Sequence, residues 1–465
     1  MPNNKPNMVL CMCDQLRAHA VGCYGNDHVR TPNIDRLATM GTRFDLAFTP
    51  NPVCTPARSA TITGQYSRTC AGMLGNVHRN PPNPERVRLL GPTLPEIFGE
   101  HGYETALIGK WHMGPRPEMV GFETALYPKV AHHYYGQTYF NERAESIEVE
   151  EFAGDWEIDR VREFLESRAG CSEPFFLFHN ISQPHQPIGP GHLPDRYVNM
   201  FDPNEVPLRP NTMEDGEPSH SRWWFSVYRS ADFFWRDVKG EPQDPKDIAP
   251  EDFDLRSLTA LYYGAIACVD DQLGEMMLAL EKNHLADDTI VVFISDHGDN
   301  LGSHGLFNKN SLIEESIHIP MVVYDPRQEP GEDTETIASL IDVAPSLLEM
   351  IGVEIPAHIQ GRSLAPSVRD NGMPEEENLA FIETGPMIGV RTPSHLYGMQ
   401  YDEENHTITD GEEWFFDLTE DPYEMNNLAE SGERDGLQEE LRQKLLEWDE
   451  STPWLDAPRA ERIIE

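Results

Sequence analysis

The chain has 465 residues, of which 79 are Asp or Glu and 36 are Lys or Arg, giving a formal net charge of −43. A hydrophobic content of 39% excludes a mostly disordered chain. No segment reaches the roughly 18–20 apolar residues of a membrane span. Because the carboxylates are spread along the whole chain, their field opposes binding to nucleic acid and to anionic lipid. We therefore expect no nucleic acid and no membrane partner.

The apolar segment that begins at Met8 follows a short polar lead, and no small-residue cleavage site comes after it. It indicates a first β-strand rather than a signal peptide, which favours a cytoplasmic location. The seven cysteines are an odd number at irregular spacings, so reduced thiols are expected rather than a disulfide framework. The acidity fits a surface adapted to high salt and an ordinary acidic cytosolic protein equally well.

From residue 8 to about 350, apolar β-rich segments alternate with helical patterns. The expected strands are Met8–Cys13, Thr105–Ile108, Phe175–Asn180, Thr289–Ser295 and Pro320–Tyr324. The expected helices are Asn33–Met40, Thr93–His101, Asp155–Arg168, Leu255–Asn283 and Ile337–Ile351. This alternation predicts an α/β fold in which helices sandwich a large, mostly parallel sheet. Ligands of such folds bind at the carboxyl ends of the strands.

The pattern changes near residue 356, so we expect a catalytic domain over residues 1–355 and a smaller C-terminal subdomain over residues 356–465. The expected strands Leu379–Glu383, Tyr397–Gln400 and Trp414–Leu418 and the helix Arg434–Trp448 indicate an antiparallel α+β lobe. Between residues 186 and 250, a stretch rich in proline and aromatic residues has no clear periodicity, which is typical of a functional loop.

Polar residues follow several of the predicted strands. They are Asp14 and Gln15 after the first strand, Lys110 and His112 in GKWHMG, His185 in SQPHQP, Asp296 and His297 in SDHGD, and Lys309 in HGLFNKNS. Because the carboxyl ends of parallel strands converge on one crevice, we expect these side chains to lie together. Burying so many polar groups requires partners, which a bound cation and a bound anion would supply.

The chemistry of these groups divides them into two sets. The metal candidates Asp14, Gln15, Asp296 and His297 offer mostly oxygen, which suits a hard divalent ion such as Ca²⁺, Mg²⁺ or Mn²⁺. The anion candidates Lys110, Lys309 and Arg58 offer fixed positive charge, and His112 and His185 can transfer protons near neutral pH. Together they predict the transfer of a phosphoryl or sulfuryl group.

The segment NPVCTPARSATITG places Cys54 before a predicted helix, with Thr55 as N-cap, Pro56 as the first helical residue and Gly64 as the stop. The positive end of such a helix stabilises anionic species at Cys54. Arg58, in the first turn, can reach back toward the thiol. A packed core thiol would have apolar neighbours rather than Pro, Thr and Arg, so the pattern favours a functional cysteine.

These motifs resemble those of the type I sulfatases of the alkaline phosphatase superfamily. CTPAR fits the family's Cys/Ser-x-Pro-x-Arg signature, and GQYSRTCAG continues it. GKWHMG, PHQP, SDHGDNLGSHGLFNK and LIEESIHIPMVVY match the family in order and spacing, and WFFDLTEDPYEMNNLA is similar to its closing segment. The resemblance covers nearly the whole chain and implies an alkaline phosphatase-like fold and the hydrolysis of a sulfate monoester.

The resemblance also implies that a formylglycine-generating enzyme oxidises Cys54 to formylglycine while the segment is still unfolded. The hydrated aldehyde, held by the metal and Arg58, then attacks sulfur, and His185 with Lys309 protonates the leaving oxygen. A second hydroxyl loses its proton to His112, and C–O cleavage ejects sulfate and restores the aldehyde. The cations that hold the nonbridging oxygens are Lys110 and Lys309. Position 54 is accordingly counted among the metal ligands as well as being the nucleophile.

One position departs from the family's usual pattern. Many members carry a second aspartate where Gln15 stands, so this site has one negative charge fewer for the metal. The Asp-Gln pair is similar to that of the choline-sulfatase and phosphonate monoester hydrolase branches. A phosphonate monoester or phosphodiester hydrolase that uses the same formylglycine is therefore the alternative function. A non-catalytic anion- or sugar-binding protein and a phosphatase with an unmodified nucleophile fit the motifs less well.

The aromatic segments 127–140 and 221–235 are expected to fold over the crevice and to stack on a sugar or aryl ring. The substrate-binding candidates are His132, His133, Tyr134, Tyr135, Arg222, Trp223 and Trp224. Because the acidic surface disfavours long sulfated polysaccharides, we expect a small sulfated sugar or oligosaccharide, or an aryl or alkyl sulfate. The residues do not choose among these substrates, and they leave homo-oligomerisation open.

Overall fold

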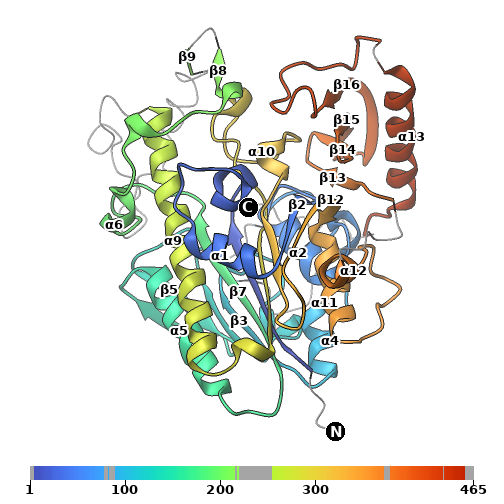
Figure 1. Ribbon diagram of the computed structural model, residues 1–465. Coiled ribbons are helices and arrows are strands. Elements are labelled where there is room, and N and C mark those ends of the chain that lie inside the picture. Colours follow the sequence, from blue (N-terminus) through green and yellow to red (C-terminus); the bar gives the residue numbers. More distant parts are fainter. Residues whose placement is uncertain are drawn as a thin grey trace.

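The computed structural model describes residues 5–77, 89–214, 254–370, 377–432 and 434–455, together with residues 82, 217 and 218. Figure 1 shows a central sheet with helices on both of its sides and, at the right of the view, a smaller lobe built from the C-terminal part of the chain. This arrangement confirms the predicted α/β class with a separate antiparallel lobe.

The central sheet has the strand order β12-β2-β11-β10-β1-β7-β3-β4-β5-β6 among the described residues. Its strands are β1 (Asn7–Asp14), β2 (Thr42–Phe48), β3 (Glu104–Gly109), β4 (Thr124–Pro128), β5 (Gln137–Asn141), β6 (Ser146–Val149), β7 (Phe175–Pro184), β10 (Thr289–Ser295), β11 (Met321–Tyr324) and β12 (Gly331–Ser339). The four central strands β10, β1, β7 and β3 are parallel neighbours. Strand β11 is antiparallel to β10, and β5 and β6 continue the opposite edge antiparallel.

The two faces of the sheet carry different halves of the core. In β1, Val9 and Cys11 pack with α1, α5 and α9, whereas Met8 and Leu10 pack with α2, α4 and α11. The helices that contribute to these faces are α1 (Pro32–Met40), α2 (Cys54–Thr63), α4 (Leu94–Glu100), α5 (Ala153–Arg168), α9 (Leu255–Lys282), α11 (Val343–Met350) and α12 (Ala365–Asp370). The shorter elements are α3 (Ser67–Cys70), α6 (Asp195–Val198), α10 (Glu314–Ile317), β8 (Met213–Glu214) and β9 (Glu217–Pro218). A strand buried on both faces reads as continuous apolar sequence, which is what β1 and β10 show.

Most predicted elements of the first 350 residues are confirmed within a few residues, and one is wrong. The helix expected over Ile337–Ile351 begins only at Val343, because residues up to Ser339 form the end of β12, which pairs with β2. The carboxyl oxygen Oδ2 of Asp342 accepts the backbone N–H of Ser339 at 2.8 Å and marks the change from strand to helix. An apolar run of this length does not by itself distinguish a buried strand from a helix.

The C-terminal lobe is a four-stranded antiparallel sheet of β13 (Ala380–Glu383), β14 (Met387–Arg391), β15 (His395–Asp402) and β16 (Thr407–Asp417), covered by α13 (Asp435–Ser451). A buried cation joins this lobe to α3 of the larger part of the chain. The Arg68 guanidinium, fully buried, donates from Nε to Glu383 of β13 at 2.5 Å and also pairs with Asp449 of α13. The predicted division at residue 355 stays a prediction.

Two expectations about the whole chain concern membranes and thiols. Within the described ranges, no helix combines the length and the apolar character that crossing a membrane requires. All seven cysteines carry free thiols, as their number and spacing predicted.

Candidate active site

The site lies where the four central parallel strands end. Asp14 is the last residue of β1 and Gln15 follows it, while Asp296 and His297 follow β10. Lys110 directly follows β3, and His185 directly follows β7. Because neighbouring parallel strands end at one edge, these four segments deliver their polar side chains to a single place.

Cys54 lies at the same place, at the start of α2. The helix begins at Cys54 itself, after Val53, so the predicted N-cap at Thr55 is wrong. The Thr55 hydroxyl instead donates to the His112 carbonyl at 2.8 Å and accepts the backbone N–H of Val77 at 3.1 Å. Cys54 therefore lies in the first turn of α2, where backbone N–H groups still favour an anion. The predicted stop is confirmed, since Gly64 has a φ of 65°.

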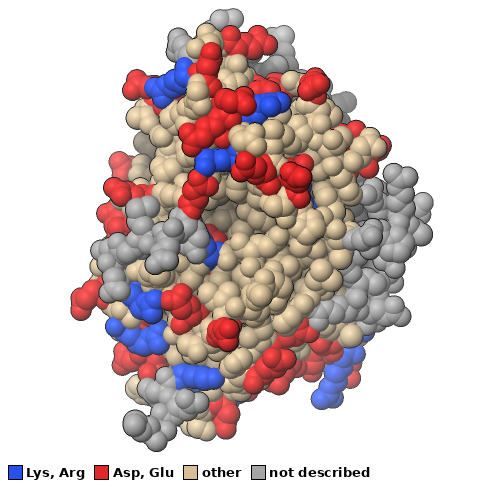
Figure 2. All heavy atoms as spheres, turned by 90° about the vertical axis from the view of Figure 1, so that its right-hand side faces the viewer, with Lys and Arg blue, Asp and Glu red and all other residues tan. Residues whose placement is uncertain are grey.

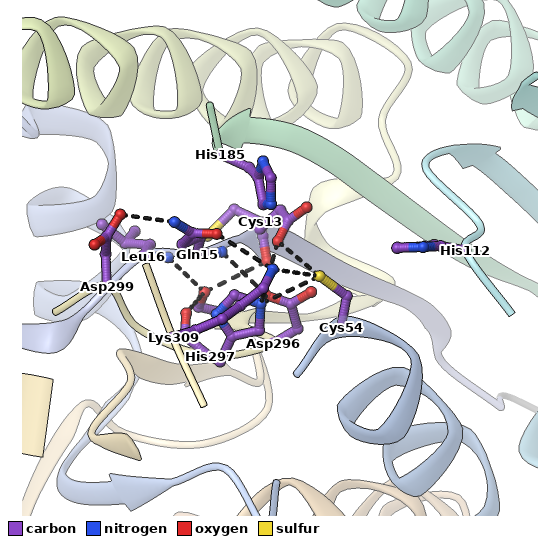
Figure 3. A network of polar contacts seen from close by, with 12 residues as sticks. Cys13, Gln15, Leu16, Cys54, His112, His185, Asp296, His297, Asp299 and Lys309 are labelled. Carbon is purple, nitrogen blue, oxygen red and sulfur yellow. Dashed lines mark hydrogen bonds and ion pairs between the residues drawn. The ribbon is translucent and has the colours of Figure 1, made fainter. Parts of the chain in front are cut away.

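Four side chains converge on one buried position. Atoms of Asp14, Cys54, Asp296 and His297 that can bind a metal all lie within 4.8 Å of one another. Cys54 Sγ lies 3.6 Å from Asp14 Oδ1 and 3.3 Å from His297 Nε2. The Nδ1 atom of His297 lies 2.8 Å from the Gly298 carbonyl, which assigns the proton to Nδ1 and leaves the lone pair of Nε2 facing the cluster. Figure 3 shows these side chains pointing toward one another.

The Lys309 ammonium lies in the middle of this donor set. Its Nζ atom is 2.8 Å from Cys54 Sγ, 3.1 Å from His297 Nε2 and 3.3 Å from Gln15 Oε1. The donor set therefore already accommodates one cation. Carboxylate and amide oxygens with one imidazole form a set that fits a hard divalent ion, so the residues present suit the metal that the sequence predicts.

The charges around Cys54 change its acidity. Burial and the Asp14 carboxylate raise the pKa of the Cys54 thiol, but Lys110, Lys309 and His297 lower it, and the result lies well below the usual range. Burial lowers the pKa of the Lys309 ammonium, but Cys54 and Asp14 raise this pKa by more than burial lowers it. The Lys309 side chain therefore stays charged. The side chain at position 54 therefore lies where negative charge is stabilised.

Two further cations bind the carboxylates that face the cluster. Arg58 Nε donates to Asp296 Oδ2 at 3.0 Å, and its Nη1 donates to Asn180 Oδ1 at 2.7 Å. Lys110 pairs with Asp14 Oδ2. Burial raises the pKa of Asp14, but Lys110 and His185 lower it more, so the carboxylate is ionised. Both cations are fully buried, which makes their electrostatic influence stronger than at a surface.

Three histidines line the other side of the position. The rings of His132 and His185 stack with centroids 3.5 Å apart, and the His112 ring stands perpendicular to His132 at 5.9 Å. Burial lowers the pKa of all three imidazoles. His132 comes from the connection between β4 and β5, and a quarter of its side chain is accessible. It therefore faces the solvent side of the site.

The other substrate-binding candidates lie differently. The Tyr134 hydroxyl donates to the His185 carbonyl at 2.7 Å inside the core, so this ring supports the segment that carries His185. The His133 carbonyl accepts the side chain of Gln137 at 2.7 Å, and Tyr135 packs 5.5 Å from Phe152. Arg222, Trp223 and Trp224 lie outside the described residues.

Sequence reasoning missed three side chains that hold the site together. Asn180, at the end of the predicted third strand, accepts from Arg58. Gln186 and Asp299 form hydrogen bonds with Gln15. Gln186 and Asp299 stand inside the quoted motifs PHQP and SDHGD, directly after His185 and two residues after His297. Their position next to predicted functional residues was the available signal.

Comparison with known proteins assigns a family to this site. The sulfatase family matches residues 6–353, and the C-terminal region of N-sulphoglucosamine sulphohydrolase matches residues 302–451. An N-acetylglucosamine-6-O-sulfatase of Bacteroides thetaiotaomicron is 28% identical over 95% of this chain and 86% of its own. The multifunctional alkaline phosphatase superfamily protein PehA of Trinickia caryophylli is 28% identical over 96% of this chain and 95% of its own.

A solved structure gives the same result at the level of the fold. This structure shows a protein in complex with its substrate, D-glucosamine-2-N,6-O-disulfate. Its sequence is 26% identical to this chain, and the two structures match with a TM-score of 0.78 over 96% of this chain and 98% of the other. The chain therefore belongs to the sulfatase family, as a type I sulfatase of the alkaline phosphatase superfamily. It is a sulfuric ester hydrolase.

Proposed function

We propose that the chain hydrolyses the sulfate monoester of a small alcohol with a nucleophile derived from Cys54. The carrying observation is the position of Cys54 Sγ, which is buried and lies within 3.6 Å of Asp14, His297 and Lys309. Oxidation of Cys54 to formylglycine by a formylglycine-generating enzyme, as is general in the family, would supply a hydrated aldehyde there. A small sulfated sugar is the first candidate, because the relatives include sulfatases of such sugars.

The metal would be one divalent ion, with Ca²⁺ as the first choice. Asp14, Gln15, Asp296, His297 and position 54 would hold it. Such an ion, when bound, lowers the cost of negative charge on the nucleophile and on the sulfate oxygens. Arg58 donates hydrogen bonds to both Asp296 and Asn180 and so would hold this carboxylate in place beside the metal.

The remaining side chains would act on the substrate. Lys110 and Lys309 would hold the nonbridging oxygens of the sulfate, since both ammonium groups lie beside Asp14 or Cys54. As the sulfur–oxygen bond to the alcohol breaks, His185 would place a proton on the alcohol oxygen. His112 would take the proton whose loss releases sulfate. The His132 ring, stacked on His185, would contact the alcohol on the solvent side.

Two measurements on the purified protein test this proposal. Conversion of Cys54 to formylglycine replaces one sulfur and two hydrogens by one oxygen. The mass of the tryptic peptide 44–58 should therefore be lower than that of the unmodified peptide by the mass of one sulfur and two hydrogens minus that of one oxygen. The kcat/KM for glucosamine 6-sulfate and 4-nitrophenyl sulfate should exceed that for phenyl phosphonate monoesters. An unmodified thiol in fully active enzyme would refute the mechanism.

The alternative function is hydrolysis of phosphonate monoesters or phosphodiesters at the same site. It is favoured by one feature of the chain: Gln15 stands where many sulfatases carry a second aspartate, and the resulting Asp-Gln pair is similar to that of the phosphonate monoester hydrolase branch. A kcat/KM that is higher for the phosphonate than for both sulfates would establish this alternative in place of the sulfatase reaction.

A further inference from the structure

Asp299 lies behind the proposed metal ligands and receives two glutamine side chains. Its Oδ2 atom accepts Gln15 Nε2 at 2.7 Å and Gln186 Nε2 at 3.0 Å, while its Oδ1 atom accepts the backbone N–H of Leu301 at 2.8 Å. The Asp299 side chain is fully buried. Figure 3 shows Asp299 on the far side of Gln15 from Cys54 and Lys309. None of the proposed catalytic roles uses this carboxylate.

The contacts determine which end of the Gln15 amide faces the site. An amide has an oxygen that accepts and an NH₂ group that donates, and an ionised carboxylate only accepts. With the NH₂ group on Asp299, the oxygen Oε1 lies 3.3 Å from the Lys309 ammonium. The reversed amide would set its oxygen against the Asp299 carboxylate and its NH₂ group against the ammonium. Both contacts would be repulsive, so the observed orientation is the stable one.

We propose that Asp299, assisted by Gln186, is a positioning residue that holds the Gln15 amide with its oxygen toward the metal. This inference rests on the proposed metal-dependent function of the same site. The family's usual second aspartate carries its negative charge on the metal itself. In this chain the negative charge is on Asp299, which contacts the Gln15 side chain instead of the metal. The charge acts on the metal through the polarised amide of Gln15.

The test is a cycle of variants read out by calcium binding. The variants are Gln15→Glu, Asp299→Asn and the double variant Gln15→Glu/Asp299→Asn, each stripped of metal. Calorimetry gives the Kd for Ca²⁺, and melting with and without Ca²⁺ confirms binding to folded protein. In the native background, Asp299→Asn should raise the Kd about 10–100-fold, as loss of a partner that orients a metal ligand typically does.

The second half of the cycle should give the opposite sign. In Gln15→Glu, the new carboxylate opposes Asp299 with no hydrogen between them, so the ligand is pushed out of place. Gln15→Glu removes the NH₂ group that donated to Asp299. Adding Asp299→Asn supplies an NH₂ group from the other side, which can donate to the new Glu carboxylate, and it restores the native net charge. Asp299→Asn should therefore lower the Kd in the Gln15→Glu background, although it raises the Kd in the native one.

Several outcomes would overturn the inference, and a control separates them from general destabilisation. If Asp299→Asn weakens binding in both backgrounds, Asp299 acts by charge alone and positions nothing. No effect in either background also refutes the proposal. Asp270→Asn is the matched control, because this buried aspartate instead holds Asn33 and the start of α1, and it should leave the Kd unchanged.

The same experiment distinguishes this inference from the proposed function. A native protein that binds no Ca²⁺, Mn²⁺ or Mg²⁺ contradicts the metal-dependent reaction and the inference together. A native protein that binds metal, without the change of sign, contradicts the inference alone. Should Asp299→Asn by itself not fold, a lower Kd in the double variant than in Gln15→Glu still decides the matter.

Discussion

Glu157 of α5 carries a carboxyl group that is buried in the core. Among the described residues, no Lys or Arg forms an ion pair with it. Its exposed fraction is 1%, and its Oε1 atom accepts the Tyr139 hydroxyl at 2.7 Å. Burial raises the pKa of Glu157 from about 4.5 to about 8, and the bond from Tyr139 only partly opposes this rise. The folded protein therefore keeps a proton that the unfolded chain loses above pH 4.5.

This proton predicts how stability depends on pH. Between about pH 4.5 and 8 the folded state binds one proton more than the unfolded state, so the free energy of unfolding falls as the pH rises. The slope is about 1.4 kcal/mol per pH unit for one proton. Glu157→Gln should remove this contribution, so its Tm should fall less between pH 5 and 8 than that of the native protein. Thermal melts measure this difference.

The matched control is Glu163→Gln, an exposed position on the same helix. It should show the native slope of Tm against pH. Parallel slopes for Glu157→Gln and the native protein would show that Glu157 is ionised in the folded state.

At this scale the sequence could predict which side chains approach one another but not how they are oriented. The strand ends indicated that Asp14, Asp296 and Lys110 would meet, because parallel strands share an edge. The direction of the Gln15 amide depends on Asp299 and Lys309, which are nearly 300 residues away in the chain. Such an orientation follows only from contacts that the fold creates.

Gly109 shows how an element positions two functional residues at once. It ends β3 with a φ of 102°, and a Cβ atom there would lie 2.0 Å from the Asn180 carbonyl oxygen of β7. The same oxygen accepts the backbone N–H of Lys110 at 2.9 Å. The close approach of β3 and β7 therefore fixes Lys110 and, through Asn180, the Arg58 guanidinium.

Gly109→Ala should separate these two strands. The substitution should lower the free energy of unfolding by more than about 1–2 kcal/mol, which is the usual cost of placing alanine in a left-handed conformation. It should also lower kcat, because Lys110 and Asn180 move. Gly102→Ala is the matched control, since Gly102 also has a positive φ of 82° but no atom within 4 Å of the added Cβ. Urea unfolding and kcat should show a small cost and native activity for the control. Equal effects of the two substitutions would contradict this account.

Elements with a strong local pattern were predicted correctly, and elements defined by their partners were not. α9 has a long run of apolar positions and an Asp254 cap that accepts the N–H of Ser257 at 2.8 Å, and both features can be read in the sequence. The strand end at residues 337–339 depends on pairing with β2, and the short strands β4, β5 and β6 likewise depend on pairing with their neighbours in the sheet. Their apolar runs are too short to identify them alone.

The acidic residues that give the chain its charge of −43 are spread along the whole sequence. Figure 2 shows acidic side chains from the top to the bottom of one face. Because the Debye length falls from about 30 Å at 0.01 M salt to about 8 Å at 0.15 M, added salt should weaken the repulsion between them. The compact state concentrates this charge, so salt should favour folding.

We therefore expect the Tm to rise as KCl is increased from 0.01 M, with most of the rise complete once the Debye length is shorter than the spacing of the charges. Differential scanning calorimetry measures the change. As a control, the Tm is measured in sucrose solutions of matched osmolality. Because sucrose adds no ions, the Tm should not show the early rise that is expected as KCl is increased from 0.01 M. A Tm that is independent of KCl would show that local ion pairs offset the net charge.

The buried Arg68 has a consequence for how the chain is made. Its partners Glu383 and Asp449 follow it by 315 and 381 residues. A ribosome that adds about 5–20 residues per second synthesises Glu383 roughly 15–60 s after Arg68. During that interval the guanidinium must stay in water, since a buried cation without its partner costs about 3–5 kcal/mol. The α2–α3 region, which begins at Cys54, can therefore close completely only after translation has nearly finished.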